Sequence, residues 1–353
     1  MSHFSVVVCL DGGVTRATVE AQLEQVMAPW DEGKEVEPYR SYEKGGPAEH
    51  WLYGSLKCAA EHYAAGTGIL PYKPDEFGWS SASSKNTPDE QRAEQKADAE
   101  LFASLPNPIT WADIVKLYNE RYGDEEEALL LSEDGSRAYT MSTYNPESKW
   151  DYWRIGGRWG GYFPYRNECA ALVIKTERGW DSPDDIMPLH CDGGPKSALN
   201  LKAMREEKAA EARKLYAEYR ETAAGTPDAL PWSAFRDNIS EGTGYDIEQA
   251  RTEYHSQPRV LALRSSETFK WHDDVIREFS VPEKLYVERE RARAVPGYAT
   301  ITTDGRWMAP GKMGWFGMGS DDESSRIGYW EAANAYIEAL PDDAWLVALD
   351  CHI

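Results

Sequence analysis

The chain has 353 residues, with 38 basic and 60 acidic side chains and a formal net charge of −22 at pH 7. This length allows a substantial core in one large domain or two ordinary ones. The excess of carboxylates repels phosphates and no basic stripe is visible in the sequence, so direct nucleic-acid binding is not expected. The 14 Trp and 20 Tyr exclude disorder throughout the chain, because they can bury a large apolar area.

Membrane insertion and secretion are not expected either. No window approaches 18 apolar residues, and the N-terminus lacks a cationic stretch followed by a hydrophobic run. The five cysteines are odd in number and form no C-x-x-C pair, which favours reduced, mostly buried thiols over a disulfide framework or a zinc site. These observations predict a cytoplasmic protein.

The two ends of the chain each predict a strand next to a helix. Residues 4–10 form a β-branched apolar run before Asp11-Gly12-Gly13, and apolar residues at helical spacing follow until Pro29. At the other end, a helical pattern over 330–340 precedes a strand over 345–353. The chain therefore begins β-α and finishes α-β.

Further strands are expected between these ends. Asp-Gly turns at 134–135 and 304–305 predict two hairpins, and apolar runs predict strands over 150–163, 170–175 and 259–263. Strands and helices do not alternate regularly, so we expect an α+β fold with a mixed, mostly antiparallel sheet, ferredoxin-like elements and helical insertions.

The domain prediction is a single compact α+β body over 1–353. Residues 66–109 are expected to form an irregular and helical excursion from it, because they combine Gly, Pro and Ser with a highly charged run. Residues 195–225 are expected to form a long helix that projects from the body, since its apolar stripe is interrupted by Lys208.

The segment 145–163 combines glycines, aromatic rings and arginine. Paired glycines allow a ligand to approach the backbone, Arg158 offers a bidentate fork for an anion, and indole rings supply stacking faces. The candidate ligand-binding residues are Trp150, Trp153, Gly156, Gly157, Arg158 and Trp159. The alternative is a bulged central strand whose tryptophans are core and whose arginine pairs with an internal carboxylate.

A second glycine-rich loop over 311–319 precedes the last predicted helix. Helix N-termini attract anions, so Gly314, Trp315 and Gly317 are further candidate ligand-binding residues. The order of the glycines does not fit a dinucleotide-binding fingerprint. Alternatively, the aromatic side chains of this loop plug the core.

The alternation of side chains in the terminal strands predicts a third candidate site. If the first and last strands pair antiparallel, His3 and His352 become neighbours and Asp350 lies close to both. Two imidazoles and a carboxylate can bind a divalent transition metal or carry out acid–base chemistry. Polar residues at strand ends are also commonly structural, and that alternative stays open.

Four motifs resemble a family of uncharacterised proteins encoded by tailed bacteriophages, especially those of actinobacteria. They are Met1-Ser2-His3-Phe4, Asn145-Pro146-x-x-Lys149-Trp150-Asp151-x-Trp153-x-Ile155-Gly156-Gly157-Arg158-Trp159, Gly311-x-Met313-Gly314-Trp315-x-Gly317-Met318 and Asp350-Cys351-His352-Ile353. The resemblance covers the whole chain. It implies an accessory protein made in the cytoplasm of an infected bacterium, where such proteins often serve host takeover or counter-defence.

Two functions are compatible with these patterns. As a binding protein, the chain would capture a nucleotide-like or other small anionic molecule, or a host protein. As an enzyme, it would use His3, Asp350 and His352, with a metal, to hydrolyse a nucleotide-like substrate. Binding is preferred, because the sequence contains no recognisable pair of nucleophile and base.

Overall fold

The computed structural model describes residues 3–42, 50–66, 88–122, 128–176, 187–239, 244–272, 274–311 and 321–353. Contacts within the chain form two compact units. The first combines Met1–Lys34 with Asn145–Ile353, and the second is Glu35–Tyr144. This division differs from the single body expected over 1–353, because the second unit has cores of its own.

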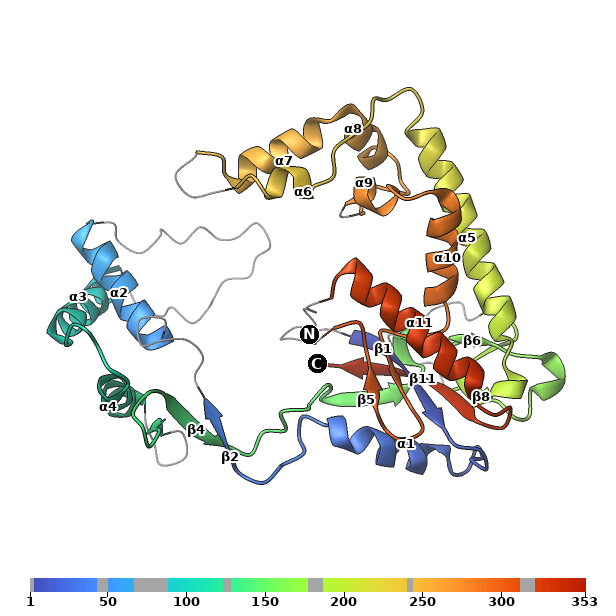
Figure 1. Ribbon diagram of the computed structural model, residues 1–353, viewed down its shortest axis with the longest axis horizontal. Coiled ribbons are helices and arrows are strands. Elements are labelled where there is room, and N and C mark those ends of the chain that lie inside the picture. The colour runs from blue at the N-terminus through green and yellow to red at the C-terminus, as the bar shows by residue number, and fades with distance from the viewer. Residues whose placement is uncertain are drawn as a thin grey trace. The chain divides into compact units, whose positions relative to one another are not determined.

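The first unit is built on a six-stranded mixed sheet (Figure 1). Its strands are β1 (His3–Leu10), β5 (Tyr152–Ile155), β8 (Gly193–Pro195), β9 (Ala299–Ile301), β10 (Trp307–Met308) and β11 (Trp345–His352). The order is β10-β9-β1-β11-β5, and β8 also pairs with β11. Only the β1–β9 pairing among these strands is parallel, which confirms the α+β class with a mostly antiparallel sheet.

The expected pairing of the terminal strands is present. β1 and β11 run antiparallel from His3 opposite His352 to Leu10 opposite Trp345. Helices α1 (Val19–Met27) and α11 (Glu323–Ala339) combine with β1, β9, β10 and β11 in the β-α-β-β-α-β order of a ferredoxin-like unit, with β5, β8 and the other elements inserted between α1 and β9. The strand order departs from that fold, because β9, the first strand of the hairpin, lies beside β1 and parallel to it.

Helices cover both faces of this sheet, with α1 and α11 on opposite sides in Figure 1. Val6 and Val8 pack with Leu23 of α1, whereas Val7 packs with Ile337 of α11. Because both faces are covered, the middle of β1 is apolar at every position rather than at alternate ones.

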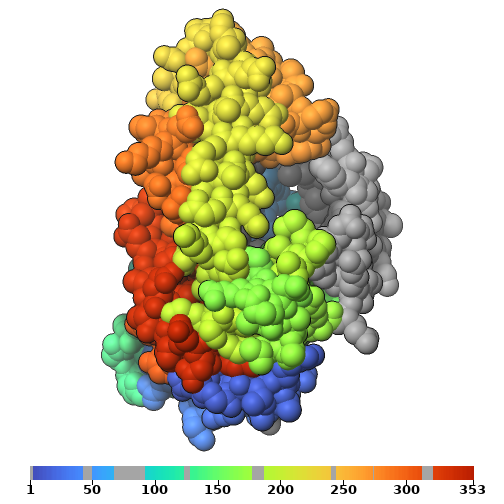
Figure 2. Space-filling view, turned by 90° about the vertical axis from the view of Figure 1, so that its right-hand side faces the viewer, coloured from blue at the N-terminus to red at the C-terminus, as the bar shows by residue number. Residues whose placement is uncertain are grey.

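A group of helices completes the first unit. The elements are α5 (Leu201–Thr222), α6 (Ser233–Arg236), α7 (Ile247–Ser256), α8 (Pro258–Arg264), α9 (Val275–Glu278) and α10 (Glu283–Arg293). They enclose a separate apolar cluster that includes Tyr219, Phe269 and Phe279. Figure 2 shows α5, in yellow, extending along the surface of this unit. The long helix predicted over 195–225 is thus α5, preceded by β8 and a short 3₁₀ turn at Lys196–Ala198.

Two of the expected strands are wrong. Residues 259–263 belong to helix α8, because Pro258 is well suited to the first helical turn and Val260 and Leu263 are buried three residues apart. Residues 170–175 form turns, and only a single bridge joins Ile174 to Gly193. The remaining short strands, β6 (Phe163–Pro164) and β7 (His190–Cys191), pair with each other.

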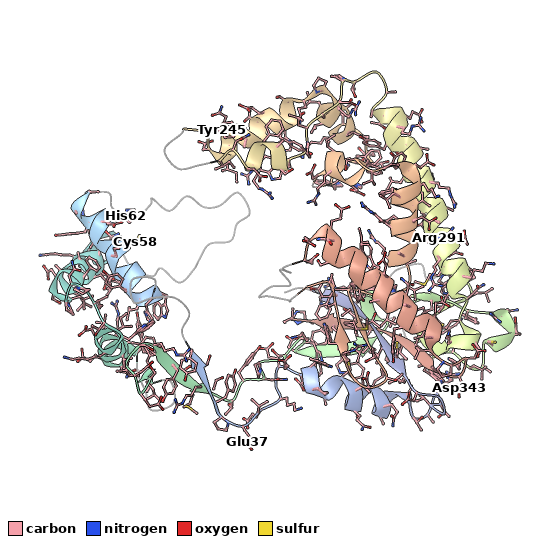
Figure 3. The ribbon with its side chains drawn as sticks, viewed as in Figure 1. Glu37, Cys58, His62, Tyr245, Arg291 and Asp343 are labelled. Atoms are coloured by element: carbon pink, nitrogen blue, oxygen red, sulfur yellow. The ribbon has the colours of Figure 1, made fainter. Side chains whose placement is uncertain are left out.

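The second unit combines a small antiparallel sheet with helices. Its strands are β2 (Tyr39–Tyr42), β3 (Leu130–Leu131) and β4 (Ala138–Ser142), and its helices are α2 (Trp51–Ala64), α3 (Pro88–Ser104) and α4 (Trp111–Tyr122). β3 and β4 form the expected Asp-Gly hairpin. Within the excursion predicted over 66–109, α3 is helical and residues 67–87 lie outside the described part. Figure 3 marks Cys58 and His62 on α2.

All five cysteines are free thiols, as expected. Cys9, Cys191 and Cys351 are buried, and burial raises the pKa of the Cys9 thiol to about 12. Such buried thiols are poor nucleophiles at neutral pH. Within the described ranges, no helix combines the length and apolar character needed to cross a membrane.

Candidate functional site

The register of β1 and β11 brings His3 against a fully buried carboxylate. Nδ1 of His3 lies 2.8 Å from Oδ1 of Asp350, whose side chain is 0% exposed. The other carboxylate oxygen accepts a hydrogen bond of 3.0 Å from the backbone N–H of Arg158, and Nε of Arg154 lies 3.6 Å from it. These contacts compensate for the loss of water around a buried charge.

A second histidine and carboxylate pair lies beside the first. Nδ1 of His352 is 2.6 Å from Oδ1 of Asp151. The ring of Tyr152 stacks on His352 with centroids 4.9 Å apart, and its hydroxyl lies 3.3 Å from Nε2 of His3. The two imidazoles meet edge to face with centroids 4.9 Å apart. Two histidines, two aspartates and a tyrosine therefore form one network.

The predicted neighbourhood of His3, Asp350 and His352 is thus correct, but its geometry does not resemble a metal centre. Each imidazole directs Nδ1 to a different carboxylate, rather than all three groups pointing to a common point. In the part of the chain that the structure describes, no group of three or more His, Cys, Asp or Glu side chains could hold a metal ion. The arrangement favours hydrogen-bonded acid–base pairs.

The Gly-Gly-Arg segment is closed by buried carboxylates. Gly156 and Gly157 have positive φ angles of 71° and 55°. A Cβ on Gly157 would lie 2.4 Å from Oδ2 of Asp350, and one on Gly156 would lie 2.8 Å from Oδ1 of Asp192. The space that these glycines leave is therefore filled by the protein itself, which fits the structural alternative better than a ligand cradle.

Asp192 anchors the same segment from a second side. Its Oδ1 accepts a hydrogen bond of 2.7 Å from the backbone N–H of Gly161. Its Oδ2 accepts hydrogen bonds from the backbone N–H of Thr176 at 2.7 Å and from the Thr176 hydroxyl at 2.8 Å. The side chain is buried, so each of these contacts is shielded from water.

The other predicted ligand-binding residues of this segment separate in the structure. Trp150 and Trp153 pack into the core facing α1. The side chain of Arg158 is exposed, while its backbone binds Asp350. Trp159 lines a pocket. The predicted residues Gly314, Trp315 and Gly317 lie outside the described residues.

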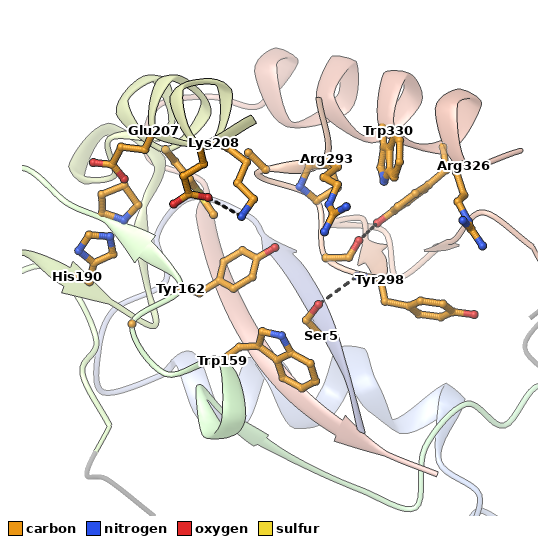
Figure 4. Close-up of a pocket in the computed structure, with 18 of the residues that line it drawn as sticks. Ser5, Trp159, Tyr162, His190, Glu207, Lys208, Arg293, Tyr298, Arg326 and Trp330 are labelled. Carbon is orange, nitrogen blue, oxygen red and sulfur yellow. Dashed lines mark hydrogen bonds and ion pairs between the residues drawn. The ribbon is translucent and has the colours of Figure 1, made fainter. Parts of the chain in front are cut away.

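Trp159 lines a pocket that lies between the sheet and helices α5, α10 and α11 (Figure 4). We name it the sheet pocket, and its volume is about 770 Å³. Aromatic rings contributing to its walls are Trp159, Tyr162, Tyr298, Tyr329 and Trp330. Its cationic side chains are paired with carboxylates, as Lys208 is with Glu211 at 2.8 Å and Arg326 is with Asp321. The walls carry three acidic and three basic side chains, so this pocket has no clear preference for anions.

A second hollow, which we name the cationic pocket, lies among α7, α8 and α9 and has a volume of about 440 Å³. Its walls are Trp232, Arg251, Tyr254, His255, Arg264, Lys270, Trp271, His272, Asp274 and Arg277. Four permanently cationic side chains thus face a single carboxylate, in a chain whose formal net charge is −22. Local charge of this sign favours an anionic ligand.

Two of these cations are free to contact a ligand. Within the described ranges, the guanidinium groups of Arg264 and Arg277 have neither an ion pair nor a hydrogen bond. Arg251 is paired with Glu248 at 2.7 Å, and Lys270 is paired with Glu267. Both side chains are exposed, so a ligand can reach them from water.

Asp274, the single carboxylate of the pocket, is engaged by donors that carry no net charge. Its oxygens accept hydrogen bonds from the hydroxyl of Tyr254 at 3.1 Å, from the backbone N–H of Trp232 at 3.3 Å and from that of Arg277 at 3.2 Å. The last contact caps helix α9. Asp274 therefore orders the walls of the pocket without forming an ion pair with its arginines.

The titration of His255 reflects the positive surroundings. Burial, followed by the positive charges of Arg264 and Arg251, lowers the pKa of this imidazole below its ordinary value. Its Nδ1 atom is buried and has no hydrogen-bond partner within the described part of the chain. Trp271 adds an aromatic face that is 83% exposed. The pocket thus combines cationic side chains, an imidazole nitrogen without a hydrogen-bond partner in the described part of the chain and an exposed indole ring.

Sequence patterns did not indicate the cationic pocket. Arg251, Arg264 and Arg277 come from three separate helices, so no linear motif joins them. The segment around Trp271 reads as a solvated helix face in the sequence. The exposure of Trp271, which draws attention to this region, is visible only in the structure.

Comparisons with known proteins identify no relative. No protein-family model, no curated protein and no solved structure matches the chain. The resemblance to the bacteriophage family therefore stays a prediction. Function is inferred from the contacts and charges of the chain.

Proposed function

We propose that the protein binds a small anionic molecule that carries a flat ring, such as a nucleotide, in the cationic pocket. The observation that carries this proposal is the convergence of four cationic side chains on one pocket in a strongly acidic chain. Arg251 and Lys270 are each paired with a glutamate, so Arg264 and Arg277 would make the main contacts with the ligand. An anion placed between these two arginines would be attracted by both.

The side chains of the pocket match the two parts of such a ligand. The planar guanidinium groups of Arg264 and Arg277 can each donate two hydrogen bonds to a phosphate or carboxylate. The ring of Trp271 offers a face for stacking. Charge-assisted hydrogen bonds contribute about 1.5–3 kcal/mol each, and stacking of a base contributes about 1–3 kcal/mol.

The biological role follows from the bacteriophage resemblance as a further part of the proposal. An accessory protein made in the cytoplasm of an infected bacterium would capture an anionic signal molecule and so assist host takeover or counter-defence. A host protein with an acidic, aromatic segment is the alternative occupant, because it would meet the same cations and ring. Hydrolysis assisted by a metal at His3, Asp350 and His352 has less support, since those groups form separate pairs.

The proposal is tested by calorimetric titration with pyrophosphate, adenosine, AMP and ATP. We expect ATP and AMP to bind more tightly than adenosine, and we expect ATP affinity to fall as salt is added, because the contacts are electrostatic. Arg264→Ala should weaken ATP binding about tenfold, which is one charge-assisted hydrogen bond. Arg213→Ala is the matched control, since it removes an exposed arginine of α5 that lines none of these pockets.

Two results would contradict the proposal. One is the absence of binding by every anion at millimolar concentration. The other is equal loss of affinity in Arg264→Ala and Arg213→Ala, which would mean that only overall charge matters. Binding that is lost on Arg293→Ala but not on Arg264→Ala would move the site to the sheet pocket, where Arg293 is a wall residue.

A further inference from the structure

We infer that the hydroxyl of Tyr152 is a nucleophile activated by His3 and Asp350, and that it accepts acyl groups from activated esters. The three groups form a chain of hydrogen bonds from the Tyr152 hydroxyl to Nε2 of His3 and from Nδ1 of His3 to Asp350. The order is that of a nucleophile, a base and an orienting carboxylate. This site is independent of the cationic pocket.

The hydrogen bonds determine which atom carries each proton. The ionised carboxylate of Asp350 can only accept, so Nδ1 of His3 must donate the 2.8 Å hydrogen bond. In a neutral imidazole, Nε2 then has a lone pair, and it faces the hydroxyl of Tyr152 at 3.3 Å. The phenol therefore donates to His3, which is the arrangement required for removal of its proton.

Neighbouring groups hold the base and the nucleophile in place. The backbone N–H of Arg158 fixes the second oxygen of Asp350, and the absence of a Cβ on Gly157 leaves room for that carboxylate. The ring of Tyr152 stacks on His352 at an interplanar angle of 22°, and Asp151 fixes His352 in turn. His352 is thus a positioning residue for the phenol.

The nucleophile is accessible while its orienting carboxylate is not. Tyr152 is 42% exposed and lies on β5, at the end of the strand order, whereas Asp350 is fully buried. A soluble ester can therefore approach the hydroxyl from water. Burial of Asp350 also strengthens its interaction with an imidazolium, because the local dielectric is low.

The acyl transfer balances without a further reactant. The oxygen of Tyr152 attacks the carbonyl carbon of an aryl ester, and its proton moves to Nε2 of His3. The bond between the carbonyl carbon and the aryl oxygen breaks, and the leaving phenolate takes the proton from the imidazolium. The products are an aryl ester of Tyr152 and a free phenol, with His3 returned to its neutral form.

The chain supplies an internal control for reactivity. Tyr63 of α2 is 41% exposed, close to the value for Tyr152. Within the described residues its hydroxyl has no hydrogen-bond partner. Exposure alone therefore predicts equal labelling of the two residues, and any excess at Tyr152 measures the effect of His3.

The test is treatment of the intact protein with p-nitrophenyl acetate, followed by peptide mass mapping over time. We expect Tyr152 to be acetylated at least tenfold faster than Tyr63, a modest part of the acceleration that a positioned base gives. In His3→Gln the rate at Tyr152 should fall to that at Tyr63, while the rate at Tyr63 is unchanged. Tyr152→Phe should remove the fast phase of nitrophenol release and retain the slow one.

Equal rates at Tyr152 and Tyr63 in the wild-type protein would overturn the inference. Retention of the fast rate in His3→Gln would also overturn it, because the base would then have no part in the reaction. If His3→Gln fails to fold, the comparison of Tyr152 with Tyr63 and the Tyr152→Phe variant still decide the question. Circular dichroism of each variant shows which case applies.

Discussion

The ring of His3 and the carboxylate of Asp350 are hydrogen-bonded at 2.8 Å although they are 347 positions apart in the sequence. The contact crosses the β1–β11 pair, where Ser5 rather than His3 is directly opposite Asp350. Side chains two positions apart lie on the same face of a strand, so His3 reaches the carboxylate diagonally. The contact thereby joins the first residue of β1 to a buried carboxylate on β11.

Removal of the buried Asp350 carboxylate should destabilise the protein strongly. Asp350→Ala leaves the backbone N–H of Arg158 and the His3 ring without their acceptor, so we expect a loss of about 3–5 kcal/mol in the free energy of unfolding. Asp151→Ala is the control, because Asp151 is exposed, although its partner His352 is mostly buried; its cost should be smaller, about 1–2 kcal/mol. Urea unfolding of both variants measures the difference, and similar losses would show that burial of Asp350 is unimportant.

Gly157 should tolerate no side chain. Gly157→Ala adds the strain of a positive φ and a contact of 2.4 Å with Asp350. Gly225→Ala carries a similar φ of 76° but meets nothing within 4 Å. We therefore expect Gly157→Ala to be about 1–3 kcal/mol more destabilising than Gly225→Ala, which is the usual cost of overpacking. Thermal or urea unfolding provides the comparison, and equal losses would mean that Asp350 moves aside freely.

Trp271 should affect ligand binding without affecting stability. Its ring is 83% exposed, so Trp271→Ala should change the free energy of unfolding by no more than about 0.5 kcal/mol. Loss of stacking should weaken ATP binding roughly tenfold. Leu261→Ala, which removes another exposed apolar side chain of this region outside the cationic pocket, should leave ATP affinity unchanged. An unaltered affinity in Trp271→Ala would remove the stacking part of the proposal.

His255 should report occupancy of the cationic pocket. Its lowered pKa means that the unfolded chain binds more protons than the folded one as pH falls through its titration range. The free energy of unfolding therefore decreases as pH falls through this range, and it increases again as pH rises. A bound anion offsets Arg264 and Arg251, so its pKa should rise when pyrophosphate is added. NMR titration measures the pKa of the imidazole with and without pyrophosphate. An unchanged pKa at saturating pyrophosphate would place the anion elsewhere.

Local alternation in the sequence was sufficient to predict the terminal histidine site. His3, Asp350 and His352 could be placed together because the two strands are long and apolar, and a period of two fixes which residues share a face. Tyr152 and Asp151 could not be added, since the position of β5 beside β11 depends on a long-range pairing. Tyr152, the proposed nucleophile, therefore could not be assigned to this site from the sequence, because only the pairing of β5 with β11 brings it there.

The helical part of the first unit was harder to predict for a different reason. Short apolar runs such as that around Val260 fit a buried strand and a buried helix equally well, which explains the wrong assignment of α8. The cationic pocket requires the correct placement of α7, α8 and α9 before its arginines converge. Spacing along the chain carries no information on that convergence.

The pairing of β1 with β11 also has a consequence for synthesis on the ribosome. At about 5–20 residues per second, synthesis from His3 to Asp350, a span of 347 positions, takes roughly 20–70 s. For most of that time β1 lacks both of its neighbours, because β9 and β11 are made late, β9 before β11. The inserted unit Glu35–Tyr144 has contacts of its own and can fold meanwhile. The apolar strand β1 therefore stays without its partner strands for most of synthesis, and the sheet closes around it only at the end.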